Sequence, residues 1–242
     1  QPQSISRSKW LSLSWFSYMI GRRQHRNPTD FYVSTPDSRG VSVPVTLTQK
    51  NAVVESLTTL SPVIPANSYY QYFGFYGLTN GVDTIIATAT GYEPDTAFVR
   101  VTSTRLTTGG LPGSTTTTNP PIGVYVYATD SLGTAHYVSD TVVVQAVSSD
   151  TTVIRPLRPY IRILRDNYYL LDTVNIVGPG TANITYSDSA GTGYASTTTN
   201  TITVTGPSLT LGNGSPVLGM RQRGGVNSSY VYTPNVVATP LV

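Results

Sequence analysis

The sequence predicts an all-β protein that is built from repeated β-sandwich domains. Charged residues make up only 11% of the 242 residues, while threonine, serine, glycine, valine and tyrosine dominate, which is typical of strands and turns. Strand-like runs such as 82–90 and 140–147 are separated by turn signals such as Thr79-Asn80-Gly81. No run shows the 3.6-residue period of an amphipathic helix.

An internal repeat of about 100 residues supports the same conclusion. The dipeptide Tyr69-Tyr70 returns as Tyr168-Tyr169, at an offset of 99 residues. A second motif occurs three times, as "YVSTPD" from Tyr32, "YVYATD" from Tyr125 and "YVYTPN" from Tyr230. Several short strands in each repeat predict one β-sandwich per repeat.

The repeat divides the chain into five segments. We expect an aromatic and basic opening segment at 1–28 that includes the first strand of repeat 1, followed by a domain at 29–106. A Thr-, Gly- and Pro-rich stretch at 107–121 reads as a linker by its composition. A second domain is expected at 122–209, and 210–242 as a linker and the opening strand of an incomplete third repeat. Because the third repeat is incomplete, we expect the chain to be a processed or truncated part of a longer array.

The closing strands resemble a known family. The stretches "NGVDTIIATATGY" (80–92) and "PGTANITYSDSAGTGY" (179–194), followed by "FVRVT" and "TITVT", are similar to bacterial Ig-like repeats of the invasin (BIG2) type. The resemblance implies tandem Ig-like sandwiches that serve as a spacer or a binding scaffold, and it brings no catalytic residues with it. The chain departs from antibody-type domains because it has no cysteine, and the sequence places no tryptophan in either core.

Three interpretations of the opening segment are open: a signal peptide, an interfacial membrane anchor, or the first strand of a repeat. The third is favoured because residues 9–26 align without gaps on 207–224, at an offset of 198. Small or polar residues of the later copy are replaced by large ones in the first, namely Trp10, Trp15, Phe16, Tyr18 and Met19. A domain that folds with glycine and asparagine there does not need aromatic rings for its core, so we expect a partner-binding surface. The alternative is that the rings cap the exposed end of the first domain.

Basic residues strengthen this expectation. Residues 1–28 carry five basic residues and no acid, whereas the rest of the chain has ten basic and twelve acidic residues. Arg22, Arg23 and Arg26 are therefore predicted to join the partner surface, with anionic lipid headgroups as a further contact. Two secondary surfaces are predicted: one of Arg155, Arg158, Arg162 and Arg165, and one of Tyr70 and Tyr72 in "YYQYFGFY". The alternative for the arginines is an ordinary solvated strand face. The alternative for the tyrosines is that a loop or a neighbouring domain covers their rings.

No motif in the sequence indicates catalysis or metal binding. His25 and His136 have no carboxylate or second histidine beside them in the sequence, and Glu93 and Asp95 flank Pro94 in a turn. No nucleotide-binding, hydrolase, zinc or calcium motif occurs. We therefore expect no enzyme activity, no cofactor, no metal, no small-molecule substrate and no nucleic-acid partner.

The function expected from these observations is structural. The first hypothesis is a membrane-extrinsic Ig-like subunit that docks onto other subunits of a membrane protein assembly, with a bacterial reaction-centre and light-harvesting complex as an analogy. The alternatives are a cell-surface adhesin or spacer array and a carbohydrate-binding module. No apolar run approaches the ~20 residues needed to span a bilayer, so we expect an exported protein, periplasmic or at the cell surface, that is peripheral to the membrane.

Overall fold

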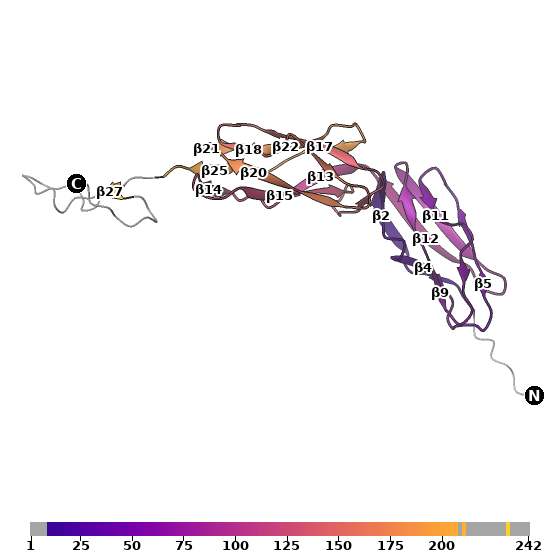
Figure 1. Cartoon of the computed structure of the whole chain (residues 1–242). Helices are drawn as coiled ribbons and strands as arrows, with labels where there is room; N and C mark the ends of the chain where they lie inside the picture. The colour runs from indigo at the N-terminus through magenta and orange to yellow at the C-terminus, as the bar shows by residue number, and fades with distance from the viewer. Residues whose placement is uncertain (1–8, 208–209, 212–230, 233–242) are drawn as a thin grey trace, which may run out of the picture.

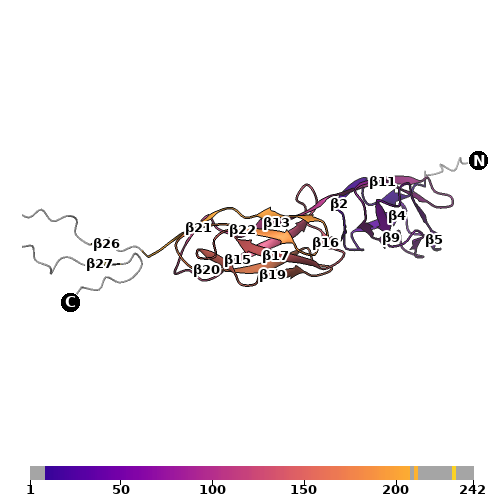
Figure 2. The same cartoon turned by 90° about the horizontal axis from the view of Figure 1, so that it is seen from above.

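The computed structural model describes residues 9–207, 210–211 and 231–232, and it confirms the all-β class. None of these residues is helical, so none belongs to a helix that could cross a membrane. Two β-sandwiches follow one another along the chain and meet at a bend (Figure 1, Figure 2).

The first sandwich has two sheets. One contains β1 (Ser12–Leu13), β4 (Phe31–Ser34), β9 (Tyr70–Phe73) with its continuation β10 (Phe75–Gly77), and β7 (Glu55–Leu57). The other contains β2 (Ser17–Gly21), β12 (Asp95–Thr102), β11 (Gly81–Thr88) and β6 (Thr46–Gln49). The short strands β5 (Val43–Pro44) and β8 (Val63–Ile64) pair with each other.

The second sandwich repeats this order. One sheet runs β18 (Ile154–Pro156), β20 (Tyr169–Ile176), β15 (Ile122–Thr129), β13 (Thr104–Gly109) and β23 (Tyr194–Ala195). The other face is formed by β14 (Ser114–Thr116), β25 (Ile202–Thr205), β21 (Gly180–Ala182), β22 (Ile184–Asp188), β24 (Thr197–Thr198), β17 (Val142–Ser148) and β19 (Tyr160–Ile163).

Both sandwiches have the strand order of an Ig-like domain. The opening strand of each repeat is split between the two sheets. Its first part, β1 or β13, pairs antiparallel with β4 or β15 in one sheet. Its second part, β2 or β14, pairs parallel with β12 or β25 in the other sheet. In the first sandwich the remaining strands are β4, β9 with β10, and β7 in one sheet and β12, β11 and β6 in the other, and the two sheets pack face to face as in an Ig-like fold.

Each sandwich has its own core. Inward-facing strand residues such as Ile85 and Val99 in the first, and Val126 and Val144 in the second, are fully buried. They alternate with outward residues along each strand, as the two-residue period of a strand requires. The first core cluster ends at Val101 and the second begins at Leu106.

Residues 107–121 do not form the linker that their composition predicts. They supply the end of β13, all of β14 and the buried side chain of Leu111. Threonine and glycine suit the split opening strand as well as a coil, and composition alone does not separate the two. The chain instead passes from the first sandwich to the second through Ser103 alone, between β12 and β13.

A third strand pair lies beyond the second sandwich. Thr210–Leu211 (β26) pairs with Val231–Tyr232 (β27) in the same register, at an offset of 198, as β1 with β4. The rest of the predicted third repeat lies outside the described residues.

Candidate functional site

The structure packs some residues of the predicted N-terminal partner surface against the first core and leaves others exposed. Trp15 packs against three phenylalanines of the first core, with ring centroids 4.3 Å from Phe31, 5.5 Å from Phe73 and 5.9 Å from Phe75. Tyr18 contacts the same cluster, with its ring 4.9 Å from that of Phe31. The expectation that no tryptophan belongs to a core is wrong, because the segment crosses between the sheets where the end of the sandwich is open.

Trp10 and Phe16 remain exposed. Trp10 is 53% exposed beside Glu93, and Phe16 is 74% exposed, with only an edge contact to Phe98 at 5.4 Å. Met19 is partly exposed in β2. For Trp10 and Phe16, a role in partner binding stays a prediction.

Two of the predicted basic residues contact the second domain, and the third forms its contacts within the first domain. Arg23 forms an ion pair with Asp140, with Nη2 3.2 Å from Oδ2, and the Arg22 guanidinium lies against Gly193. Arg26 pairs with Asp30 at 2.9 Å and covers the ring of Tyr18. Arg22 and Arg23 therefore contact the second domain at the junction, where the Arg23–Asp140 pair is exposed to solvent.

The junction itself is built around strand β3 (Gln24–His25), which pairs with strands of both domains. On one side His25 pairs with Tyr76 of β10, and on the other Gln24 and His25 pair with Val138 and Tyr137 of β16 (Tyr137–Val138). The backbone amide of Ser139 also donates to the carbonyl oxygen of Arg23 at 2.9 Å. One four-stranded sheet thus crosses from one domain to the next.

Side chains close the junction around this sheet. The imidazole of His25 lies between the rings of Tyr76 and Tyr137, with its Nε2 3.1 Å from a carboxylate oxygen of Asp166. Burial lowers the pKa of His25, although the Asp166 charge opposes this shift. His25 is therefore a packing residue of the junction that is neutral at pH 7.

His136 lies close to the same junction. Its Nε2 is 3.1 Å from Oδ2 of Asp130, both side chains are buried, and its ring meets Tyr18 of the first domain edge-on. Burial lowers the pKa of His136, and the hydrogen bond and charge of the Asp130 carboxylate oppose this shift. The expectation that His136 has no nearby carboxylate is wrong, because the turn at 130–134 brings Asp130 back to it.

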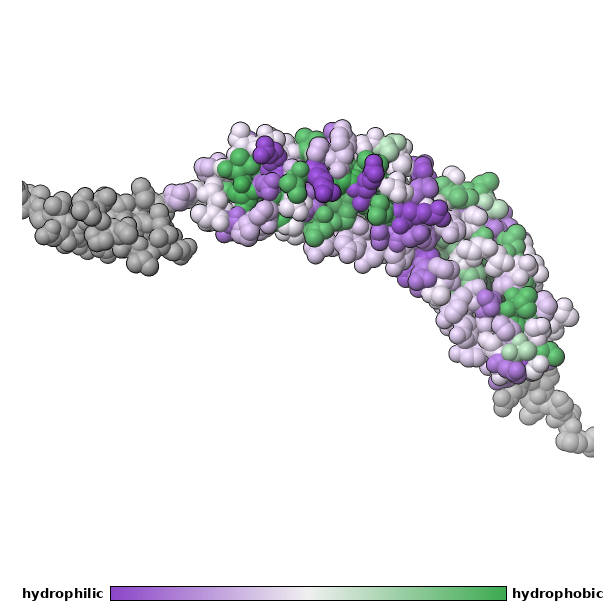
Figure 3. All heavy atoms as spheres, in the orientation of Figure 1, coloured by the Kyte–Doolittle hydropathy of each residue, from purple (hydrophilic) through white to green (hydrophobic). Residues whose placement is uncertain are grey.

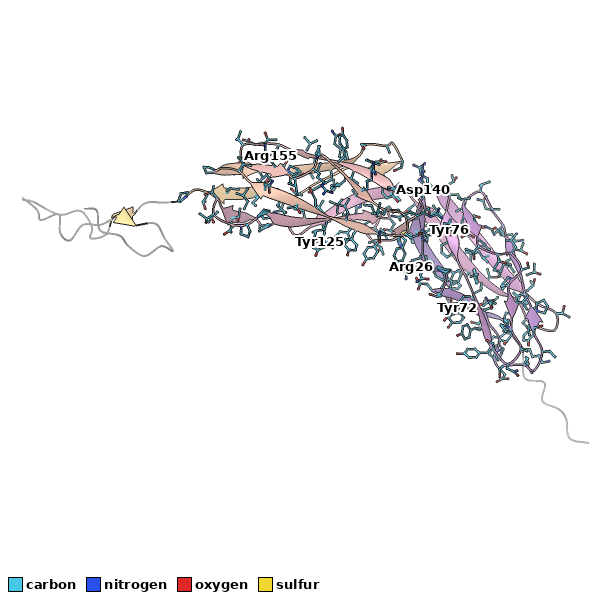
Figure 4. The ribbon with its side chains drawn as sticks, in the orientation of Figure 1. Arg26, Tyr72, Tyr76, Tyr125, Asp140 and Arg155 are labelled. Atoms are coloured by element: carbon cyan, nitrogen blue, oxygen red, sulfur yellow. The ribbon has the colours of Figure 1, made fainter. Side chains whose placement is uncertain are left out.

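Tyrosines gather on the outer face of each first sheet. In the first domain Tyr70 and Tyr72 project beside Tyr32, and in the second Tyr125 and Tyr169 do the same with ring centroids 5.9 Å apart. Figure 4 shows Tyr72, Tyr125 and Arg26 along the inner side of the bend. Binding at these rings stays a prediction.

The four arginines predicted as a secondary surface, Arg155, Arg158, Arg162 and Arg165, are all exposed, as the alternation around Arg162 predicts. Arg158 and Arg162 border one hollow at the edge of the sandwich, Arg155 projects from β18, and Arg165 lies near Asp166.

Two buried carboxyl sites were missed by the sequence reasoning. In the first domain Glu55 and Asp83 are both buried, and in the second the Tyr186 hydroxyl donates to Asp172 at 2.9 Å inside the core. An alignment of the two repeats could have revealed both sites. At the 99-residue offset, the polar residues of each site align with apolar or small residues of the other repeat. Neither site lines any of the surface hollows found among the described residues. No three metal-ligating side chains cluster within the described ranges.

Comparisons with known proteins assign no function to the chain. No family model matches the chain, and no curated protein matches it. Among solved structures, the D0–D1 domains of Intimin are 12% identical with a TM-score of 0.33, over 79% of this chain and 95% of that one. The Yersinia pseudotuberculosis adhesin InvE is 13% identical with a TM-score of 0.34, over 81% and 58%. A Bacteroides vulgatus beta-glycosidase is 12% identical with a TM-score of 0.37, over 82% and 25%.

These scores are too low to transfer a role from any neighbour. The Ig-like assignment therefore rests on the strand order, and the function on the junction and surfaces. The analogy with a reaction-centre complex has no support in the comparisons.

Proposed function

We propose that this protein is a non-catalytic structural arm whose two Ig-like domains are held at a fixed angle. The observation that supports this is the sheet shared across the junction, in which β3 pairs with β10 and β16 at once. Domains of one chain usually move relative to each other unless their interface is large and apolar. Here a connection of one residue and a continuous strand ladder replace a flexible linker.

The stiffness has a direct physical source. A linker of 15 residues behaving as a coil would let the domains wander over roughly 20 Å. Bending at Ser103 instead requires loss of backbone hydrogen bonds and of the Arg23–Asp140 and His25–Asp166 contacts. The Arg23–Asp140 pair is exposed and contributes little, so the backbone hydrogen bonds of the shared sheet are the main resistance to bending.

The distance between the two domains tests this proposal. The chain has no cysteine, so Lys50→Cys and Thr201→Cys, both at exposed positions, introduce two spin labels without background. Double electron–electron resonance should give one narrow distance distribution, because the junction allows one arrangement. A Gly-Ser-Gly insertion after Ser103 should broaden it, and an intact chain that is already as broad as the insertion variant would rule out the stiff arm.

We further propose that the exposed rings of Trp10 and Phe16 on the first domain dock onto a partner subunit of a membrane assembly. The support is the exposure of Trp10 and Phe16, which the core does not use. Trp10→Ser/Phe16→Gly restores residues of the later copy and should abolish co-purification of a defined complex from native membranes in mild detergent. Trp15 emission reports whether the variant remains folded, and unchanged co-purification would favour the surface-array alternative.

A further inference from the structure

The second domain carries a cationic surface that the first domain lacks. At the 99-residue offset, the four arginines face uncharged residues of the first repeat. The pairs are Arg155 with Ser56, Arg158 with Thr59, Arg162 with Val63, and Arg165 with Ala66. Because the fold is the same in both domains, folding does not require arginine at these positions.

Two of these arginines, Arg158 and Arg162, border a hollow of about 610 Å³ beside the edge strand β19. Tyr160 and Arg162 project from the same face of β19, since they are two residues apart. Arg158 lies just before the strand and Leu164 just after it, and Leu171 of β20 forms the opposite wall.

The positive charge of this surface is not neutralised by the protein. Among residues 9–207, Arg155, Arg158 and Arg162 form no ion pair, and Arg165 has one loose contact to Asp166 at 3.8 Å. The remaining charge attracts an anionic partner over about one Debye length, ~8 Å at physiological salt.

Apolar side chains protrude among the arginines. Leu157, Tyr160, Leu164 and Leu171 are each between 55% and 58% exposed. Figure 3 shows strongly hydrophilic and strongly hydrophobic residues side by side on this domain. Exposed leucines beside unpaired arginines match a lipid bilayer, which offers phosphate at the surface and hydrocarbon beneath it.

We propose that this face of the second domain, defined by Arg158, Tyr160, Arg162, Leu164 and Leu171, rests on an anionic lipid bilayer. The arginines contact lipid phosphates, and the leucines and the tyrosine ring enter the headgroup boundary. Basic residues near an anionic leaflet, with aliphatic and aromatic neighbours, are the usual components of such contacts. The contact depends neither on the stiffness of the junction nor on Trp10 and Phe16.

Vesicle co-sedimentation of the whole chain tests the proposal. Vesicles of phosphatidylcholine containing one quarter phosphatidylglycerol should bind the protein, and vesicles of phosphatidylcholine alone should not. Arg158→Thr/Arg162→Val, which installs the residues of the first domain, should weaken binding about 30-fold, since each arginine near such a surface contributes roughly a factor of five. Leu164→Thr/Leu171→Thr should weaken it at unchanged charge.

The control removes the same charge elsewhere. Arg100 and Arg105 are exposed and form no ion pair within the described residues, so Arg100→Thr/Arg105→Thr should change binding less than twofold. Equal losses in both arginine variants would show a net-charge effect and overturn the proposal. So would binding that is insensitive to the leucine variant and is displaced by polyglutamate, which would instead identify an acidic polypeptide as the partner.

Discussion

Replacing Glu55 with glutamine is expected to stabilise the first domain, by an amount that grows as the pH rises from about 4.5 to about 8. The Glu55 side chain is fully buried, and its Oε2 has no hydrogen-bond partner within the described residues. Burial, and then the neighbouring charge of Asp83, raise the pKa of Glu55 to about 8. A glutamine amide keeps the shape and can donate to Asp83.

The sign of the pH dependence follows from proton uptake. Unfolded Glu55 ionises near 4.5, whereas the folded domain holds its proton up to about pH 8, so folding takes up a proton between these values. The free energy of unfolding of the first domain is therefore highest below about pH 4.5. It falls as the pH rises, by up to about 1.4 kcal/mol per pH unit. The glutamine variant has no such proton, and its advantage should reach several kcal/mol by pH 8.

Tryptophan fluorescence during urea unfolding measures this effect for the first domain alone, because both tryptophans, Trp10 and Trp15, lie in it. The matched control is Glu93→Gln, at the only other glutamate of the chain, which is exposed. Glu93→Gln should leave the pH dependence unchanged. A wild-type domain that is equally stable at pH 5 and pH 8 would show that Glu55 is ionised inside the fold.

The fold was predictable because strand patterns repeat faithfully. The 99-residue offset places β7 on β18, and β9 with β10 on β20, and the inward residues alternate as expected in each. The opening segment contains β1 and β2, and its Leu11 and Leu13 are buried in the first core. These features depend on local periodicity, which a single sequence displays directly.

The junction was not predictable, because it depends on contacts between distant segments. Thr107–Pro121 has the composition of a linker, yet it forms strands, while the real connection at Ser103 has no distinctive sequence. Likewise, Trp15 aligns with Asn213 of the later copy, and only the three-dimensional path of the segment shows that its ring fills the first core. Nothing in the spacing of His25 and Asp166 indicates that they meet.

The second domain has its own buried carboxyl, and removing its partner should be costly. Tyr186→Phe deletes the hydroxyl that donates to Asp172 in the core, and leaves Asp172 with the Thr173 amide as its remaining hydrogen-bond donor among the described residues. Both side chains are at most 2% exposed. We expect a loss of about 2–3 kcal/mol in the free energy of unfolding at pH 7, the usual value for a hydrogen bond to a charged group.

The loss should shrink as the pH falls. Burial raises the pKa of Asp172, and the hydrogen bond from Tyr186 opposes that shift, so its removal raises the pKa further. A protonated Asp172 carries no buried charge, and Tyr186→Phe should therefore cost less at pH 4 than at pH 7. Circular dichroism follows the unfolding of both domains, and Trp emission identifies the transition of the first, which should not move.

Two variants separate the buried pair from a general effect of losing a hydroxyl. Tyr125→Phe alters a partly exposed ring on the outer face and should have almost no effect on stability. Asp172→Phe/Tyr186→Ala installs the residues found at Phe73 and Ala87 of the first domain, and should recover most of the loss, since replacing a whole buried polar pair by packed apolar groups costs far less than breaking it. If Tyr186→Phe costs no more than Tyr125→Phe, Asp172 is already neutral at pH 7, and the second domain holds a buried acid much as the first does.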